Sequence, residues 1–423
     1  MYELFFVLGL TILTGFLATI IFERIRVSQV ILLMVFGFLL GPVLHIIDVS
    51  EESIMVSIMP FIATLALIVL LFDAGLNIDV FSVARAIPKG TVFTVLVFIL
   101  SILFVTTFAK AILGWPVLHG MLLGAVVGGT SSAIVITMVE KIKIKQETKS
   151  LLTVESTMTD ALCIIVTVII IQLIITDQAL DAGTIINLLV SSFSLAVITG
   201  VISAVIWILL IQRFVVTKYA YMLTLALVFG LFAITEAVKA NGGFAVFIFG
   251  LVLGNAKELR KLLKIESSFS VNPTIHLFQE EITFFVRTFF FVYIGLLLSL
   301  SYFTIEIVGV SIILIVLFLI ARTLSQRIVL NDLPIKDRNI VVSVLPRGLA
   351  AAVLATMPLT NGIVISGFQP IAFEVLLISN IVATVSIFVF DKKEGPEKND
   401  LNEVDDDALE DKKKSKETKH KKK

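Results

Sequence analysis

Apolar runs of about 20 residues, separated by short charged segments, recur along almost the whole chain. A run of this length, when helical, matches the thickness of the hydrocarbon core of a bilayer. Of the 423 residues, 58% are hydrophobic and 16% are charged, against about 25% charged in soluble proteins. The pattern predicts an all-α membrane protein and leaves no stretch that fits a soluble enzyme domain.

The runs predict about thirteen membrane-spanning helices. Their approximate ranges are 3–22, 27–46, 57–76, 91–113, 117–139, 150–175, 184–212, 219–238, 242–255, 277–300, 303–325, 339–358 and 364–390. Residues 1–390 would form one transmembrane domain, and the highly charged residues 391–423 would form a disordered cytoplasmic tail. Cys163 is the single cysteine, which excludes an internal disulfide and a cysteine metal cluster.

The distribution of Lys and Arg predicts the orientation in the membrane. One alternate set of loops carries most of these residues, and we assign Arg322 to that set. The opposite set holds only Lys110 and Lys239. Because cytoplasmic loops are enriched in Lys and Arg, the N-terminus is predicted to lie outside the cell membrane and the C-terminus inside. The Lys-rich end of the tail is expected to be solvated by default, with contact to anionic lipid as the alternative.

Three pairs of short motifs recur seven spans apart. VFGFLLGP (35–42) resembles IFGLVLGN (248–255), LLFDAGL (70–76) resembles FFVYIGL (290–296), and GGTSSAIVITM (128–138) corresponds to LPRGLAAAVLATM (345–357). Because seven is odd, the two halves insert with opposite orientation. We therefore expect an inverted-topology repeat, spans 1–6 against spans 8–13, which is the architecture of many secondary transporters.

Two carboxylic acids, Glu155 and Asp160, lie inside the sixth predicted span. Each costs about 2.5–3.5 kcal/mol near the bilayer centre, so such residues typically mark ion or proton pathways. Their side chains differ by about 140° around the helix axis, and they need not share a partner. One carboxylate can be held ionised by a buried cation while the other exchanges Na⁺ or H⁺. Arg347 is the natural permanent cation, because arginine stays protonated and binds carboxylates through two donors.

Two spans contain breaks suited to a midplane ion site. Residues 128–132 of the fifth span read Gly-Gly-Thr-Ser-Ser, and Pro346-Arg347-Gly348 interrupts the twelfth. Proline removes a helix donor and glycine weakens a helix, so we expect broken helices that cross at the ion site. Asp73, at the end of the third span, is either a solvated interfacial residue or an oxygen ligand near the mouth of the site. Arg287 is expected to neutralise a buried acid or the pair Glu280 and Glu281.

The motifs GGTSSAIV, VESTMTDAL, LPRGLAAAV and LLFDAGL together resemble the monovalent cation/proton antiporter superfamily, most closely its NhaP-like Na⁺/H⁺ exchangers. The resemblance covers essentially residues 1–390. It implies a homodimer in which a six-helix core moves like an elevator against a scaffold. It further implies that Asp160 is the exchanging acid and that Glu155 pairs with Arg347. The implied cation ligands beside Asp160 are Ser156, Thr159, Thr130 and Asp73, with Na⁺ held by Asp160, Ser156, Asp73 and Thr130.

Two departures from the family pattern bear on the transported ions. Thr159 stands where relatives carry Asn or Asp, so one titrating carboxylate remains and 1:1 electroneutral exchange is expected. The TSSA motif is closer to potassium-efflux relatives, which keeps a K⁺/H⁺ antiporter as the alternative. An intramembrane aspartyl protease using Asp73 and Asp160, or a conductive channel, fits less well. The favoured function is Na⁺ (or Li⁺)/H⁺ antiport, with no enzymatic activity, no cofactor and no nucleic-acid partner.

Overall fold

The computed structural model describes residues 2–25, 28–47, 59–78, 88–140, 142, 144–176, 182–214, 220–238, 240–257, 259, 273–298 and 304–391. Within these ranges all regular secondary structure is helical, which confirms the predicted all-α class. The charged tail, apart from Asp391, lies outside the described residues, and its disorder stays a prediction.

The helices of the first half precede the long helix α10 (Ala182–Phe214). They are α1 (Tyr2–Ile25), α2 (Gln29–Phe38), the π-helical turn η1 (Leu39–Val43), α4 (Met59–Asn77), α6 (Pro88–Phe108), the π-helical turn η2 (Ala109–Leu113), α7 (Val117–Val127), α8 (Ser132–Glu140) and α9 (Gln146–Thr176). The helices after α10 are α11 (Ala220–Ala237), α12 (Gly242–Gly254), α14 (Pro273–Leu297), α15 (Ile305–Val329), α16 (Ile335–Ser343), α17 (Leu349–Thr360) and α18 (Phe368–Asp391).

Several helices are long and apolar enough to cross a membrane. In the described part of the chain six segments meet this criterion by length and composition, and shorter apolar helices accompany them. The six are Lys89–Leu113, Val117–Glu140, Gln146–Thr176, Val190–Leu210, Ile305–Val329 and Phe368–Val389. The chain is therefore a multi-pass membrane protein, and each predicted span falls on a helix or on two consecutive helices.

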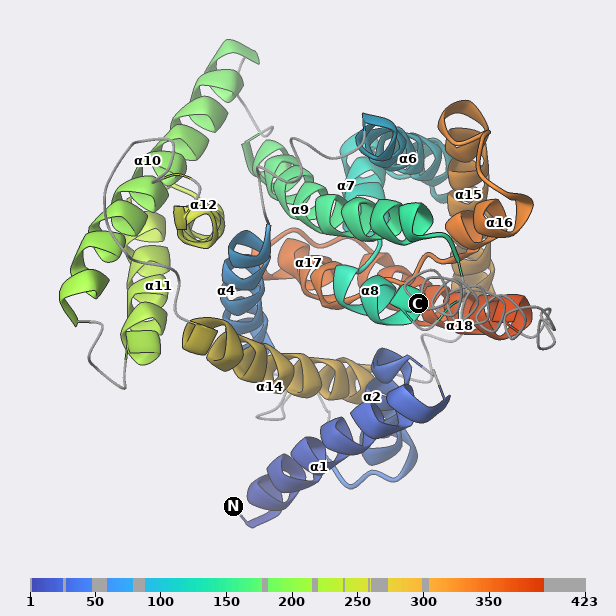
Figure 1. The fold of residues 1–423 in the computed structure, drawn as a ribbon, viewed down its shortest axis with the longest axis horizontal. Coiled ribbons are helices and arrows are strands. Elements are labelled where there is room, and N and C mark those ends of the chain that lie inside the picture. The colour runs from blue at the N-terminus through green and yellow to red at the C-terminus, as the bar shows by residue number, and fades with distance from the viewer. Residues whose placement is uncertain are drawn as a thin grey trace, which may run out of the picture.

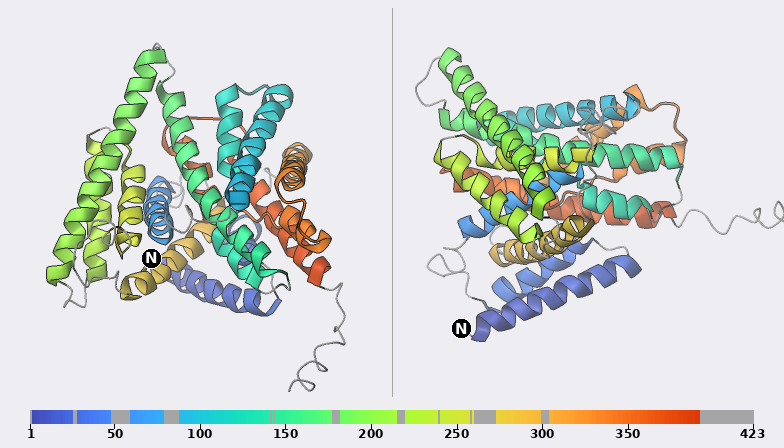
Figure 2. Two further views of the ribbon diagram at one scale, coloured as in Figure 1. Left: turned by 45° about the horizontal axis from the view of Figure 1, so that its top comes forward. Right: turned by 60° about the vertical axis from the view of Figure 1, so that its left-hand side comes forward.

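The helices form two groups that lie side by side (Figure 1). In the first group α4 packs on α12, α10 packs on α12 and α11, and α14 packs on α2. In the second group α6 packs on α7 and α15, α15 packs on α18, and α9 packs on α7 and α8. The left view of Figure 2 shows the same separation from another direction. Helices from both halves of the chain contribute to each group.

Glycines allow two helix pairs of the first group to approach closely. A Cβ atom at Gly37 of α2 would collide with the Val292 carbonyl oxygen of α14 and lie 3.0 Å from Cα of Gly295. A Cβ atom at Gly250 of α12 would lie 2.6 Å from the Phe72 carbonyl oxygen of α4. Small residues at such crossings let helix backbones come into contact, which substitutes for the hydrophobic driving force that lipid does not supply.

Candidate cation and proton site

Two helix breaks meet in the second group. The first break lies between α7 and α8, and the second lies between α16 and α17. The Ser131 amide donates a hydrogen bond to the Pro346 carbonyl oxygen, N···O 2.9 Å. A Cβ atom at Gly348 would collide with the Ser131 hydroxyl, so only glycine permits this approach. The predicted interruptions of the fifth and twelfth spans are therefore present, and they lie against each other.

Asp160 of α9 caps the first turn of α8. One carboxylate oxygen accepts hydrogen bonds from the Ser132 amide, 3.0 Å away, and from the Ser132 hydroxyl, 2.6 Å away. The first amides of a helix lack intrahelical acceptors and form the positive end of its dipole. The break thus presents backbone donors in the protein interior and holds the carboxylate at a fixed place.

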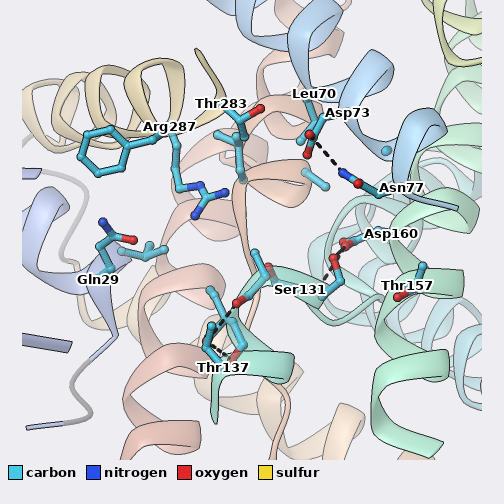
Figure 3. A pocket seen from close by; sticks show the side chains of 18 of the residues that line it. Gln29, Leu70, Asp73, Asn77, Ser131, Thr137, Thr157, Asp160, Thr283 and Arg287 are labelled. Carbon is cyan, nitrogen blue, oxygen red and sulfur yellow. Dashed lines mark hydrogen bonds between the residues drawn. The ribbon is translucent and has the colours of Figure 1, made fainter. Parts of the chain in front are cut away.

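A cavity of about 480 Å³ opens beside Asp160, between the two helix groups (Figure 3). Asp160, Thr157, Ser131 and Ser132 reach it from the second group. From the first group it is lined by Gln29, Asp73, Asn77, Thr283 and Arg287, among others. Carboxylate and hydroxyl oxygens thus line a space large enough for a partly hydrated ion. The described residues contain no cluster of three or more His, Cys, Asp or Glu side chains that could hold a metal ion.

Asp73 enters the cavity from α4. The Asn77 amide donates a hydrogen bond to Asp73, Nδ2···Oδ1 3.1 Å, from one turn further along the same helix. Arg287 of α14 points into the same space (Figure 3). Of the two readings left open by the sequence, the structure therefore gives Asp73 a place in the wall of the cavity that also contains Asp160.

Three of the predicted cation ligands do not line this cavity. The Thr130 amide donates to the Thr159 hydroxyl, N···O 3.1 Å, and that hydroxyl lies 3.3 Å from the Thr130 carbonyl oxygen. The Ser156 hydroxyl bonds to the Thr153 carbonyl oxygen of its own helix, 3.1 Å away. All three predicted ligands are buried. Thr130 and Thr159 tie the α7–α8 break to α9, and their role as cation ligands stays a prediction.

The cavity also contains polar residues that the sequence reasoning did not select. Ser132 belongs to the small polar cluster that revealed the break, but Thr130 was preferred within that cluster. Thr157 lies three residues before Asp160, so helical periodicity places the two on one face. Thr283 lies one turn before Arg287 on α14. In each case the sequence contains a polar residue near a candidate site residue. It does not indicate which side of each helix faces the cavity.

The predicted ion pair between Glu155 and Arg347 is wrong. Glu155 instead binds Arg322 of α15 through both carboxylate oxygens, with Nη2···Oε2 at 3.0 Å and a second, short contact between Nη1 and Oε1. Arg322 also donates to the Val341 carbonyl oxygen, Nε···O 2.9 Å. Its side chain is 2% exposed. Assigning Arg322 to a cytoplasmic loop was therefore also wrong, because α15 continues to Val329.

Arg347 binds backbone carbonyl groups at the helix breaks rather than a carboxylate. Its Nε donates to the Val127 carbonyl oxygen at the end of α7, and Nη1 donates to the Leu345 carbonyl oxygen, each at 2.7 Å. The guanidinium carbon lies 4.6 Å from the centroid of the Phe318 ring. Breaking a helix frees carbonyl groups that need donors, and a cation is favoured at a helix C-terminus. Arg347 meets both needs and therefore does not reach Glu155.

Helix α18 supports the same break from the other side. The Asn380 amide donates to the Arg347 carbonyl oxygen, 2.7 Å away, and its Oδ1 accepts from the Ser28 hydroxyl of the α2 N-cap, 2.8 Å away. The Arg347 amide donates to the Ser379 hydroxyl at 3.2 Å. These polar residues of the last span were not recognised from the sequence, where they look like isolated polar positions in an apolar run.

Comparison with known proteins places these features in a family context. Residues 10–393 match the family model described as "Sodium/hydrogen exchanger, transmembrane". The "Probable Na(+)/H(+) antiporter 2" of Methanocaldococcus jannaschii is 28% identical over 357 residues, which cover 80% of each chain. The "K(+)/H(+) antiporter NhaP" of Alkalimonas amylolytica is 25% identical over 395 residues, which cover 90% of this chain and 65% of that relative.

The fold is similar to a solved structure. The sodium proton antiporter MjNhaP1 from Methanocaldococcus jannaschii, determined at pH 8, superposes with a TM-score of 0.69. The match covers 92% of this chain and 97% of that chain at 21% sequence identity. At this identity the likeness concerns the arrangement of the helices.

Proposed function

Because the chain belongs to the sodium/hydrogen exchanger family, we propose that it exchanges Na⁺, or Li⁺, for H⁺ across the cell membrane, with Asp160 as the shared site. The matched relatives are transporters rather than enzymes, and the intramembrane protease hypothesis is not retained. The protein is a cation/proton antiporter in class; the identity of the cation, the site and the stoichiometry form the proposal.

The observation that carries the proposal is the setting of Asp160. Its carboxylate lies in the wall of a cavity, against the N-terminus of α8, and it accepts two hydrogen bonds from Ser132. A proton and a cation can each neutralise this one carboxylate, but they cannot do so together. Competition for a single acid therefore couples the two ions, and exchange should fall at low pH, where protons displace the cation, and at high pH, where protons become scarce.

The proposed stoichiometry is 1:1 and electroneutral. Glu155 is engaged with Arg322, so it is not free to exchange an ion. Thr159 contributes a hydroxyl and no charge beside Asp160. Glu147, in the first turn of α9, is exposed, so Asp160 is the carboxylate inside the membrane-spanning part of α9 that is left to bind a proton or a cation.

Alternating access is proposed on the basis of an inverted repeat, spans 1–6 against spans 8–13, within a fold of about thirteen spans. Gly37 of α2 lies against Val292 and Gly295 of α14, and Gly250 of α12 lies against Phe72 and Gly75 of α4. The matching motifs of the two halves thus make equivalent contacts, as a two-fold relation requires. The contact between the α7–α8 and α16–α17 breaks fits the same relation.

The cavity is proposed to open toward the cytoplasm. With the N-terminus outside, α4 and α8 end at the cytoplasmic surface, and Asn77 and Glu140 line the cavity near those ends. Ile164, Phe291 and Leu349 line it with apolar side chains, and Ile164 and Phe291 lie further along α9 and α14 toward the outer face. The arrangement supports an inward-open state, in which Asp160 meets cytoplasmic ions.

A homodimer is part of the proposal, and K⁺/H⁺ exchange is the alternative to it. The exposed apolar residues of α10, among them Ile198, Ile202 and Leu209, offer a face for lipid or for a second subunit, and a homodimer is proposed on the strength of the family. The relative from Alkalimonas amylolytica is named a K⁺/H⁺ antiporter, and it keeps K⁺/H⁺ exchange as the alternative function.

The test is a proton-flux assay in proteoliposomes with Na⁺, Li⁺ and K⁺ compared and the membrane potential clamped. We expect Na⁺ or Li⁺ to drive proton flux in the wild type, and Asp160→Asn to abolish it, because an amide neither binds a proton nor offers a negative charge. Glu306→Gln, which changes an exposed acid on α15, is the matched control and should retain full flux. Substantial Na⁺-driven flux in Asp160→Asn would refute the role of Asp160, and flux with K⁺ alone would favour the alternative.

A further inference from the structure

Among the described residues, Arg287 is the one cationic side chain that lines the cavity, and it has no role in the proposed competition of Na⁺ and H⁺ for Asp160. It projects from α14 into the cavity, across from the α7–α8 break (Figure 3). In the described part of the chain, the ionisable side chains that line the cavity are Asp73, Glu140, Asp160 and Arg287. Glu140 is exposed at the end of α8, so the interior of the cavity holds two carboxylates and one guanidinium.

Arg287 and Asp73 lie on packed helices of the first group, α14 and α4, and Asp160 lies across the cavity on α9. Because the three side chains line one cavity, the negative charge of Asp73 acts on Asp160 in the opposite sense to the positive charge of Arg287. Other ionisable groups on the surrounding helices do not line the cavity. They include Glu155 and Arg322, which bind each other, Arg347, which binds backbone carbonyls, the buried thiol of Cys163, the Tyr221 phenol, which bonds to Gln279, the buried Tyr293, and the exposed Glu147, Glu280 and Glu281.

We infer that Arg287 is a positioning residue for the exchange: a fixed internal cation that cancels the charge of Asp73 and leaves Asp160 as the one uncompensated charge inside the cavity. Arginine keeps its proton at every physiological pH, and charges across a cavity of reduced dielectric act strongly on each other. The interior of the cavity then carries one negative charge when Asp160 is empty, and none when Asp160 holds a proton or a monovalent cation.

The inference rests on the proposed antiport. It assigns control of the proton and cation affinities of Asp160 to Arg287 and Asp73 on the opposite wall of the cavity. Removing Arg287 leaves Asp73 uncompensated, which favours the protonated form of Asp160 and also attracts cations. Removing Asp73 leaves Arg287 uncompensated, which favours the ionised form of Asp160 and repels cations. Removing Arg287 should therefore raise both the proton affinity and the cation affinity of Asp160, and removing Asp73 should lower both. The double substitution should return both affinities toward the wild-type values.

The experiment measures Na⁺-driven proton flux against pH in proteoliposomes at Na⁺ concentrations well below the KM of each variant, together with the apparent KM for Na⁺ at alkaline pH. Arg287→Gln should raise the pH at which acid half-inhibits exchange by about one unit, a tenfold change in proton affinity. Asp73→Asn should lower it by about the same amount. Arg287→Gln/Asp73→Asn should return to within a few tenths of a unit of the wild type, even where the maximal rate falls.

Two controls separate charge from packing. Arg287→Lys keeps the charge and should keep the pH profile, and Glu281→Gln removes an exposed charge from the same helix and should leave the profile in place. If the Arg287→Gln single variant does not yield monodisperse protein, two other measurements test the inference. They are the lowered pH of half-inhibition in Asp73→Asn and the pH profile of the double variant. The inference is overturned if the wild type exchanges Na⁺ for H⁺ and the two single variants shift the pH profile in the same direction or not at all. If the wild type shows no exchange, the proposed function is overturned instead.

Discussion

At the scale of single residues, Asp160, Glu155 and Arg347 in the second helix group each have a distinct partner. Asp160 accepts from Ser132 at the start of α8, Glu155 binds Arg322, and Arg347 binds carbonyl groups released by the helix breaks. Removing one member of a buried ion pair leaves an uncompensated charge, whereas replacing both members with apolar residues is often neutral. The stability of this region should therefore depend on pairs rather than on single residues.

Arg322→Ala should lower the free energy of unfolding by about 3–5 kcal/mol, because it leaves Glu155 charged and unpaired in the protein interior. The double variant Arg322→Met/Glu155→Leu should recover most of that loss. Thermal unfolding of the detergent-solubilised protein measures both effects. Arg327→Ala, which removes an exposed cation from the same helix, is the control, and the assigned pairing is wrong if Arg322→Ala is equally well tolerated.

At the scale of elements, some helices are continuous, and others are interrupted near the candidate ion site. α9 and α15 are continuous and carry the Glu155–Arg322 pair, whereas α7–α8 and α16–α17 are interrupted and present backbone groups. Close crossings of α2 with α14 and of α4 with α12 depend on glycine. A side chain at these crossings would separate helices whose contact positions the wall of the cavity.

Gly37→Ala and Gly250→Ala should each destabilise the protein by about 1–3 kcal/mol, because the added methyl group has no space against the facing backbone. Gly230→Ala and Gly309→Ala are the controls, since nothing lies within 4 Å of a Cβ atom at either position. These two changes should be neutral or stabilise the helix by about 0.5–1 kcal/mol. Thermal unfolding distinguishes the two classes, and equal effects in both would contradict the close approach.

At the scale of the whole molecule, both halves of the chain contribute to each of the two helix groups (Figures 1 and 2), and residues from both groups line the cavity. Asp160 belongs to one group, and Asp73 and Arg287 belong to the other. A movement of one group against the other would carry Asp160 away from these two charges. The proposed orientation determines which side of the membrane the cavity now faces.

Cysteine labelling tests that orientation. In a Cys163→Ala background, Glu140→Cys should react with a membrane-impermeant thiol reagent from the cytoplasmic side, because Glu140 is exposed at the mouth of the cavity. Ile305→Cys, at a residue that is 92% exposed at the start of α15, should react from the outside. Intact cells and inverted vesicles provide the two accessible faces. The reversed pattern would contradict both the topology and the inward-open state.

The sequence by itself determined the helical membrane class and the position of both helix breaks, and it predicts Asp160 as the exchanging acid. These follow from local properties, namely apolar run length, the conformational preferences of glycine and proline, and the cost of a carboxylate in lipid. Only the tertiary structure decided that Glu155 pairs with Arg322, that Thr130, Thr159 and Ser156 lie behind the cavity, and that Asp73 and Arg287 share it. Those outcomes depend on which helix faces pack together, and helical periodicity fixes which residues share a face but not which neighbour that face meets.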